Sequence, residues 1–359
     1  MKAAIFHGPK QPLTIEQVEI DRPQSHEILV RTVASGVCHS DLHFVDGFYP
    51  YPPPAILGHE AAGIVEEVGD QVEYVKPGDH VIACLSLFCG HCEMCLSGRP
   101  NLCQSKPGRG MAGKPMFTWN GSPVFQFLNI SSYAEKMLLH ENAVVKIRDD
   151  MPLDRAALIG CGVMTGVGAA LNTAKVEPGS SVAVFGCGGV GLAAIQGARI
   201  AGARQIIAVD MVESKLKTAR DLGATHSVDA SSGDPVQTIR DMTGGGVEYS
   251  FEAIGNKRAA EQSFEALAPG GTATIIGMIP VGTKIELDGP AFLSEKRIQG
   301  SNMGSNRFRK DMPRYIDFYL QGRLKLDEMI TRKGRLEDVN EAFRAMKAGE
   351  VARTVLMFD

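Results

Sequence analysis

The hydrophobic pattern of the chain changes near residue 175. Before that point, short runs rich in branched apolar residues are separated by proline, glycine or charged turns, as is typical of β-strands. We expect strands at Ala3–Phe6, Leu13–Ile20, Ile28–Ala34 and His80–Cys84. After that point, apolar strands alternate with helical segments, which indicates a parallel sheet with right-handed crossovers.

The alternating region is expected to contribute six strands. They lie at Ser181–Phe185, Gln205–Val209, Thr225–Asp229, Val247–Ala253, Thr272–Gly277 and Arg297–Gly300. The helices between them are expected at Gly188–Ala201, Glu213–Leu222, Asp234–Met242 and Lys257–Leu267. The tail after Asp311 is predicted to form two amphipathic helices and a final strand, Ala352–Phe358. The pattern therefore predicts two domains, one β-rich and one doubly wound α/β.

Composition narrows the class of protein. The chain has 359 residues, of which 44% are hydrophobic and 22% charged, so it is globular and long enough for two cores. A net charge of −4 argues against a nucleic-acid or anionic-membrane partner. Glycines and polar residues interrupt the uncharged stretches 156–174 and 178–198, so we expect buried segments there rather than membrane spans. We expect a cytoplasmic protein.

Four of the eight cysteines are closely spaced, with gaps of two, two and seven residues. They are Cys89, Cys92, Cys95 and Cys103. Four thiolates fill the tetrahedral shell of zinc and leave no open position, so the spacing predicts a structural zinc site. An iron–sulfur cluster is the alternative, but a ferredoxin run places its fourth cysteine closer and follows it with proline.

A glycine-rich turn follows the expected strand Ser181–Phe185 and opens the next helix. In that context the pattern predicts a dinucleotide site, with the pyrophosphate at the helix N-terminus. Asp210 ends the next strand, where a carboxylate binds the ribose hydroxyls and favours NAD over NADP. Lys215 is placed near the adenosine ribose, although a solvated helix lysine is the alternative. The residues of the turn are Gly186, Gly188, Gly189, Val190 and Gly191.

Three further motifs concentrate metal-binding and proton-transfer side chains. They are Cys38-His39-Ser40-Asp41-Leu42-His43, Gly58-His59-Glu60 and Gly160-Cys161-Gly162. Together with the four-cysteine loop, the glycine-rich turn and the closing Arg353-Thr354-Val355-Leu356, they make the chain resemble the zinc-dependent alcohol dehydrogenases of the medium-chain dehydrogenase/reductase superfamily. The resemblance runs over essentially the whole length.

The resemblance implies a fold and two cofactors. Residues 1–162 and 302–359 would form a GroES-like, partly open β-barrel that carries the catalytic zinc. Residues 163–301 would form an NAD-binding Rossmann domain with a six-stranded parallel sheet. Two zinc ions per chain are expected, one catalytic and one structural. The reaction would be hydride transfer from a zinc-bound alkoxide to NAD, which converts a primary alcohol into an aldehyde.

Roles of individual residues also follow from the resemblance. Cys38, His59 and Cys161 would hold the catalytic zinc, and three protein ligands leave the open position that substrate needs. Asp41 would orient His59, and Glu60 would lie behind the metal. Ser40 would hydrogen-bond the alcohol, and His43 would carry its proton to solvent through the cofactor ribose.

The remaining roles concern the cofactor and the substrate. Thr165 and Val190 would press on the nicotinamide, and Arg353 would bind pyrophosphate. His39 stands where animal liver enzymes often have arginine, so weaker cofactor binding is expected. The expected substrate lining is mostly apolar and suits medium-chain, aromatic or terpenoid alcohols. It comprises Tyr49, Leu85, Phe127 and Leu128, with Asn302 or Met303.

Oligomeric state and substrate leave alternatives open. The segment Gln104–Gln126, which shorter tetrameric microbial relatives tend to lack, points to a homodimer, with a tetramer as the alternative. The rival function is thiol-dependent formaldehyde oxidation. That branch has an acidic residue where Tyr49 stands and an arginine where ungapped counting gives Pro107, although Lys106 and Arg109 lie near. A non-enzymatic role is a further alternative, but such relatives lose ligand cysteines, which are all present here.

Overall fold

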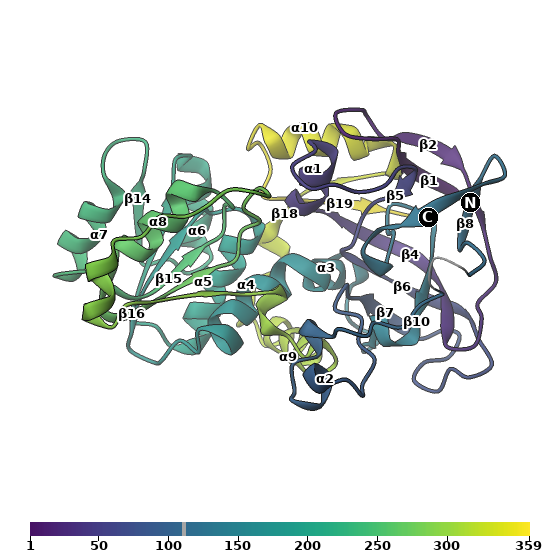
Figure 1. Ribbon diagram of the computed structural model, residues 1–359, viewed down its shortest axis with the longest axis horizontal. Coiled ribbons are helices and arrows are strands. Elements are labelled where there is room, and N and C mark those ends of the chain that lie inside the picture. The colour runs from purple at the N-terminus through teal and green to yellow at the C-terminus, as the bar shows by residue number, and fades with distance from the viewer. Residues whose placement is uncertain (110–112) are drawn as a thin grey trace. The chain divides into compact units, whose positions relative to one another are not determined.

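The computed structural model describes residues 1–109 and 113–359, and residues 110–112 of the segment Gln104–Gln126 lie outside the described residues. The chain divides into two compact units (Figure 1). Unit 1 comprises Met1–Cys161, Arg307–Asp317 and Met329–Asp359. Unit 2 comprises Gly162–Asn306 and Phe318–Glu328. Residues 302–306 and 318–328 thus group with unit 2, whereas the sequence analysis assigned everything after 301 to the β-rich domain.

Unit 2 contains a six-stranded parallel sheet in the order β14-β13-β12-β15-β16-β17. The strands are β12 (Ser181–Phe185), β13 (Gln205–Asp210), β14 (His226–Asp229), β15 (Val247–Glu252), β16 (Leu267–Ile275) and β17 (Arg297–Gly300). The helices beside this sheet (Figure 1) are α5 (Gly189–Ala201), α6 (Glu213–Asp221), α7 (Pro235–Thr243) and α8 (Lys257–Glu265). Every residue of the central strand β12 is buried, as expected for a strand covered on both faces. The predicted doubly wound parallel sheet is confirmed.

Unit 1 is built on two largely antiparallel sheets. One runs β2-β1-β5-β9-β8-β3, and the other runs β11-β7-β6-β4-β19-β18 with β10 also paired to β4. The strands before β12 are β1 (Lys2–Phe6), β2 (Thr14–Gln17), β3 (Glu19–Ile20), β4 (Glu27–Val37), β5 (Ala55–Ile56), β6 (Ala61–Val68), β7 (His80–Ala83), β8 (Phe117–Trp119), β9 (Ser122–Gln126), β10 (Lys136–His140) and β11 (Val144–Lys146). Its other regular elements include α1 (His39–Val45), α2 (Glu93–Leu96), β18 (Ile330–Gly334), α10 (Val339–Lys347) and β19 (Arg353–Met357). Helix α9 (Phe308–Leu320) begins in unit 1 and ends in unit 2.

Three expected elements differ from the structure. The strand predicted at Leu13–Ile20 is two strands that part at Val18, because β2 pairs with β1 and β3 pairs with β8. The helix predicted to reach Leu267 ends at Glu265, and Leu267 instead pairs with Val247 as the start of β16. The tail contains β18 besides the predicted helices and strand, and it lies parallel to β19.

A continuous helical run joins the two units. It consists of α3 (Leu153–Leu158), the π-helical segment η4 (Ile159–Val163), α4 (Met164–Gly168) and the π-helical segment η5 (Ala169–Thr173). The run from Leu153 to Thr173 is long and apolar enough to cross a membrane, but 83% of its most apolar window is buried inside the protein. It is therefore a core helix, in line with the buried segment expected at 156–174.

Candidate metal centres and cofactor site

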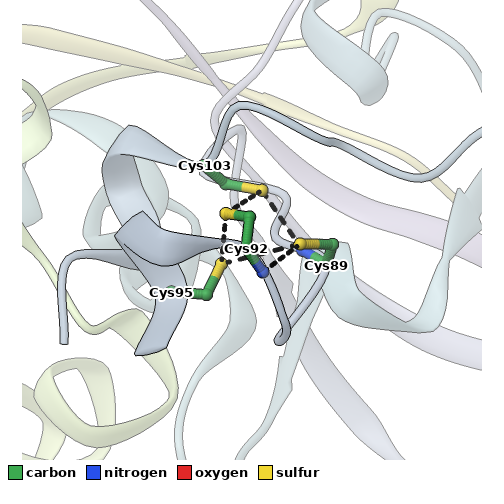
Figure 2. Close-up of side chains that lie close together, drawn as sticks. All are labelled: Cys89, Cys92, Cys95 and Cys103. Atoms are coloured by element: carbon green, nitrogen blue, oxygen red, sulfur yellow. Dashed lines mark hydrogen bonds between the residues drawn. The ribbon is translucent and has the colours of Figure 1, made fainter. Parts of the chain in front are cut away.

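Figure 2 shows that the four cysteines of the predicted structural site point toward one another. Sγ–Sγ distances are 3.5 Å for Cys92–Cys95, 3.8 Å for Cys92–Cys103 and 3.9 Å for Cys89–Cys95. A tetrahedron with zinc–sulfur bonds of 2.3 Å has sulfur atoms about 3.8 Å apart. All four side chains are free thiols, so the group fits a zinc ion.

Backbone amides of the loop also support negative charge on these sulfur atoms. The N–H of Cys92 donates to Cys89 Sγ and the N–H of Cys89 donates to Cys103 Sγ, both at 3.3 Å. Hydrogen bonds from the N–H groups of Cys95 and Gln104 lower the pKa of Cys92 to about 6. Cys92 therefore presents thiolate, the form of cysteine that binds metal. Burial and the neighbouring sulfurs raise the pKa of Cys95 to about 12, so this thiol would lose its proton only when it binds the ion.

The second group of possible ligands lies entirely in unit 1. Cys38 follows β4, His59 lies between β5 and β6, and Cys161 lies in the π-helical segment η4. Their ligand atoms lie within 4.8 Å of one another and all three residues are buried. A π-helical turn inside an α-helix is rare and often marks a functional position. Two sulfurs and one imidazole nitrogen fit a zinc ion with one position left for substrate.

The two thiols of this group share one proton. The hydrogen bond from Cys161 lowers the pKa of Cys38 well below the usual thiol range, against the effect of burial. The same bond, together with burial, raises the pKa of Cys161 well above that range. A divalent cation between the sulfurs would take the place of that proton, since metal ligation deprotonates thiols.

His59 has a fixed orientation. Its Nδ1 lies 2.9 Å from Asp41 Oδ1, and its Nε2 lies 3.1 Å from Cys161 Sγ. Because Asp41 only accepts hydrogen bonds when ionised, Nδ1 carries a proton, and Nε2 is the atom that would bind a metal ion. Without an ion the Asp41 and Cys38 charges raise the pKa of His59 well above its usual range, against the effect of burial. Asp41 thus occupies the place expected for it.

A residue that the sequence analysis missed completes this arrangement. The hydroxyl of the fully buried Tyr133 donates to Asp41 Oδ2 at 2.7 Å. Burial and the Asp41 charge raise the Tyr133 pKa well above 10, so the phenol remains a donor. Tyr133 lies 74 positions beyond His59, and no spacing rule connects the two in the sequence.

Helix α1 carries the residues expected to handle the proton. Ser40 Oγ lies 3.7 Å from Cys38 Sγ, and His43 is three residues further on, on the same side of the helix. Burial lowers the pKa of the half-buried His43, against the opposing effects of Cys38 and Asp46, so it is neutral and able to accept a proton at neutral pH. His39 is exposed on the same helix.

Glu60 and Arg353 form a buried ion pair that the sequence analysis did not anticipate. Arg353 Nη2 donates to Glu60 Oε1, and their side chains are 6% and 0% exposed. Burial raises the pKa of Glu60 to about 7, and the Arg353 charge opposes this shift. Arg353 was expected to bind pyrophosphate, and in unit 1 at least one of its nitrogens is engaged by Glu60.

Aromatic side chains surround this part of unit 1. The ring of Phe127 lies 6.1 Å from that of His59 and 4.8 Å from that of Phe44, and Tyr49 lies 6.2 Å from His43. Tyr51 was also missed, although the sequence places four aromatic residues between 44 and 51. Its ring lies 5.0 Å from Phe127 and its hydroxyl donates to the Gln126 carbonyl at 2.6 Å. Leu85 and Leu128, which were also expected to line the substrate site, are partly buried.

In unit 2 the glycine-rich turn lies between β12 and α5. Gly186 has a φ of +94°, and a Cβ on Gly191 would lie within 1.8 Å of the Gly186 carbonyl oxygen, so neither position accepts a side chain. Asp210, at the end of β13, accepts hydrogen bonds from the N–H groups of Cys187 and Met211, both at 2.8 Å. The carboxylate is thereby held against the glycine-rich turn, beside which it was expected to bind the ribose hydroxyls.

The other residues of unit 2 that were expected to contact the cofactor lie on three different helices. Thr165 is buried in α4 and its hydroxyl lies 3.4 Å from Met303 Sδ, whereas Val190 and Lys215 are partly exposed on α5 and α6. Two exposed apolar residues that the sequence analysis did not single out flank the turn. They are Met211, which is 68% exposed, and Ile254, which is 47% exposed and packs against Gly186.

Comparisons with known proteins agree with this geometry. The family described as "Alcohol dehydrogenase GroES-like domain" matches residues 24–149, and "Zinc-binding dehydrogenase" matches residues 189–321. The chain is 40% identical to an alcohol dehydrogenase class-3 of Pisum sativum over 99% of this chain and 97% of the relative.

Two solved structures have the same fold. The benzyl alcohol dehydrogenase of Acinetobacter calcoaceticus is 34% identical, with a TM-score of 0.95 over 100% of this chain and 99% of the other. A putative zinc-binding dehydrogenase of Sinorhizobium meliloti 1021, solved bound to NADP, is 28% identical, with a TM-score of 0.84 over 99% of both chains.

The fold and the two ligand groups define a zinc-dependent oxidoreductase with a GroES-like domain and a Rossmann-type domain. The chain belongs to the zinc-dependent alcohol dehydrogenases of the medium-chain dehydrogenase/reductase superfamily. It is an enzyme whose cofactors are zinc and a nicotinamide dinucleotide, NAD or NADP.

Proposed function

We propose that this enzyme reversibly oxidises primary alcohols to aldehydes with NAD, and that aromatic, medium-chain or terpenoid alcohols are its substrates. The observation that carries the proposal is the aromatic cluster of Phe44, Tyr49, Tyr51 and Phe127, which lies beside His59 and His43. Aromatic rings favour apolar and aromatic partners through burial and edge-to-face contacts. The 34% identical benzyl alcohol dehydrogenase is consistent with this substrate class.

In this proposal the alcohol gives a hydride to NAD and its hydroxyl proton to solvent. When bound, zinc acts as a Lewis acid at the substrate oxygen and the nicotinamide accepts the hydride. Cys38, His59 and Cys161 would hold the metal, and Asp41 keeps His59 in the required tautomer. The hydroxyl of Ser40 accepts the proton, and His43 passes it to solvent as a base whose lowered pKa keeps it neutral.

The decisive test is NADH formation, measured at 340 nm, with hexanol, benzyl alcohol, geraniol, a secondary alcohol, and formaldehyde with and without glutathione. We expect turnover of the free primary alcohols, with benzyl alcohol and geraniol ahead of the secondary alcohol. Activity restricted to formaldehyde with glutathione would replace this function by the rival one.

That rival, oxidation of a thiol adduct of formaldehyde, is favoured by the 40% identical class-3 relative, since class-3 enzymes are of the formaldehyde dehydrogenase type. It requires cations that bind the carboxylates of the thiol. Arg109 donates to Glu27, to Asp21 and to the carbonyls of Arg22 and Lys114, so its guanidinium is fully used. We infer that Arg109 holds its loop in place and does not bind substrate.

Replacement of Arg109 distinguishes a structural role of this side chain from a role in binding the thiol adduct. Arg109→Gln should lower the melting temperature, because Glu27 and Asp21 would lose a guanidinium whose side chain is only 8% exposed. The loss should be on the order of 2–3 kcal/mol, somewhat below that of a fully buried pair. The ratio of activity on benzyl alcohol to activity on formaldehyde with glutathione should stay unchanged. A selective loss of the second activity would show that Arg109 binds the adduct.

A further part of the proposal is that NAD is preferred over NADP, because the Asp210 carboxylate repels a 2′-phosphate. We expect Asp210→Ser to raise the ratio of kcat/KM for NADP to kcat/KM for NAD at least about tenfold, since like charges in contact disfavour binding by more than 1.4 kcal/mol. Asp229→Ser is the matched control, because Asp229 ends the neighbouring strand directly opposite Asp210. An unchanged ratio in Asp210→Ser would argue against this role.

We also propose that the enzyme is a cytoplasmic homodimer. The edge strand β17 pairs only with β16 among the described residues, and Leu293, in the turn just before it, is 90% exposed. An unpaired edge with an apolar neighbour invites pairing with a second copy. All eight cysteines are free thiols, which suits a reducing compartment. Sedimentation velocity would distinguish a dimer from a tetramer.

A further inference from the structure

The hydroxyl group of Tyr133 makes a hydrogen bond that bears on the metal site. It donates at 2.7 Å to Oδ2 of Asp41, whose other oxygen lies 2.9 Å from the Nδ1 of His59. We propose that Tyr133 is a positioning residue for His59 and acts through Asp41. The inference rests on the proposed function, because it assumes that His59 is a metal ligand.

The argument begins with the burial of Asp41, which has no exposed surface. A buried carboxylate is tolerated only when its oxygens are hydrogen-bonded. Oδ1 accepts from His59 and, at 3.3 Å, from the N–H of Gly58, and Oδ2 accepts from Tyr133. Bonds on both oxygens fix the rotation of the carboxylate, and the carboxylate in turn fixes the plane of the imidazole ring.

The backbone around Tyr133 is hydrogen-bonded to the segment directly before His59. The N–H of Ser132 donates to the Gly58 carbonyl, and the N–H of Tyr133 donates to the Leu57 carbonyl, both at 3.0 Å. The Tyr133 ring also packs edge-on against Phe343 at 6.1 Å between centroids. Phenylalanine preserves these backbone bonds and the ring packing. Tyr133→Phe therefore removes only the hydrogen bond to Asp41.

The experiment measures the affinity of the enzyme for zinc as well as its spectrum with Co²⁺ in the catalytic site. Competition with a chromogenic chelator gives the affinity of the enzyme for each of its two zinc ions. We expect Tyr133→Phe to bind one of them about tenfold more weakly than the unmodified enzyme, which is the size of effect typical of groups that orient metal ligands. The second zinc ion, in the four-cysteine site, should be released as in the unmodified enzyme. The visible absorption bands of the Co²⁺ enzyme should shift, because the imidazole orientation changes.

The control is Tyr315→Phe, which removes a hydroxyl from an equally buried tyrosine on α9, outside both ligand groups. It should leave the zinc affinities and the Co²⁺ spectrum unchanged, even if it lowers the melting temperature. This separates an effect on the metal from a general loss of stability.

A double-mutant cycle tests the route through Asp41. In an Asp41→Ala background, Tyr133→Phe should weaken zinc binding no further. An undiminished tenfold effect in that background would overturn the proposal, as would an unchanged affinity and spectrum in Tyr133→Phe alone. If the unmodified enzyme held only the four-cysteine zinc, the proposed catalytic site itself would be wrong and the inference would fail with it.

Discussion

The Cys103→Ser enzyme should bind about one zinc ion per chain in place of two and should unfold about 7–21 °C below the unmodified enzyme. Cys103 is the most deeply buried of the four clustered cysteines, and its sulfur accepts the N–H of Cys89. Zinc binding contributes about 10–16 kcal/mol to the folding of small zinc domains. A third of that energy, at about 2–4 °C per kcal/mol, gives a shift of this size.

The loop has little else to hold it. Its helix α2 has only four residues and none of them is buried. A loop with so few apolar contacts depends on the ion, as small metal-stabilised units do. Emission spectrometry of purified protein would give the metal content, and differential scanning fluorimetry would give the melting temperature.

Cys84→Ala is the matched control for this experiment. Cys84 is fully buried and belongs to neither ligand group, and burial raises its pKa to about 11, so it remains a thiol at neutral pH. The variant should retain both zinc ions. Retention of two zinc ions by Cys103→Ser would contradict a four-cysteine site.

The second large effect concerns the buried ion pair of Glu60 and Arg353. Glu60→Gln and Arg353→Met should each lower the melting temperature by about 10 °C, because removal of one partner leaves the other charge or polar group buried and unmatched, at about 3–5 kcal/mol. The double variant should recover at least half of that loss, because the buried charges disappear together. Thermal unfolding of the metal-loaded enzyme measures all three variants.

An exposed pair serves as the control. Lys2 and Glu337 lie 3.2 Å apart with side chains 49% and 43% exposed, and such pairs contribute about 0–1 kcal/mol. Glu337→Gln should therefore change the melting temperature by about 2 °C at most. If the double variant of Glu60 and Arg353 were as unstable as the sum of the single ones, the pair would not act as a unit.

Local patterns predicted the parallel sheet of unit 2 but only part of unit 1, where β5, β6 and the strands β8 to β11 were not predicted. The strand Ser181–Phe185 has the predicted bounds, because an apolar run between turns defines a buried strand on its own. The strand Arg297–Gly300 also has the predicted bounds, although none of its residues is buried. The break at Val18 was not predictable, since it arises where the chain changes from one neighbouring strand to another. The strand β18 was missed for the same reason, because it depends on pairing with β19.

The candidate sites also fall into those that a short segment defines and those that distant segments form together. The sequence by itself determined the four-cysteine site and the dinucleotide turn, because in each the chemistry lies within a short segment whose spacing sets the geometry. The ligands Cys38, His59 and Cys161 came from a resemblance, because they lie on three separate segments. Only the tertiary structure brought them within 4.8 Å of one another.

The tertiary structure alone decided which partners the buried polar groups of unit 1 have. It joined Tyr133 to Asp41 and Arg353 to Glu60, and it committed Arg109 to Glu27 and Asp21. Such partners are far apart in the sequence. They are selected because a buried charge must find a hydrogen-bonding group in whichever elements the fold packs around it.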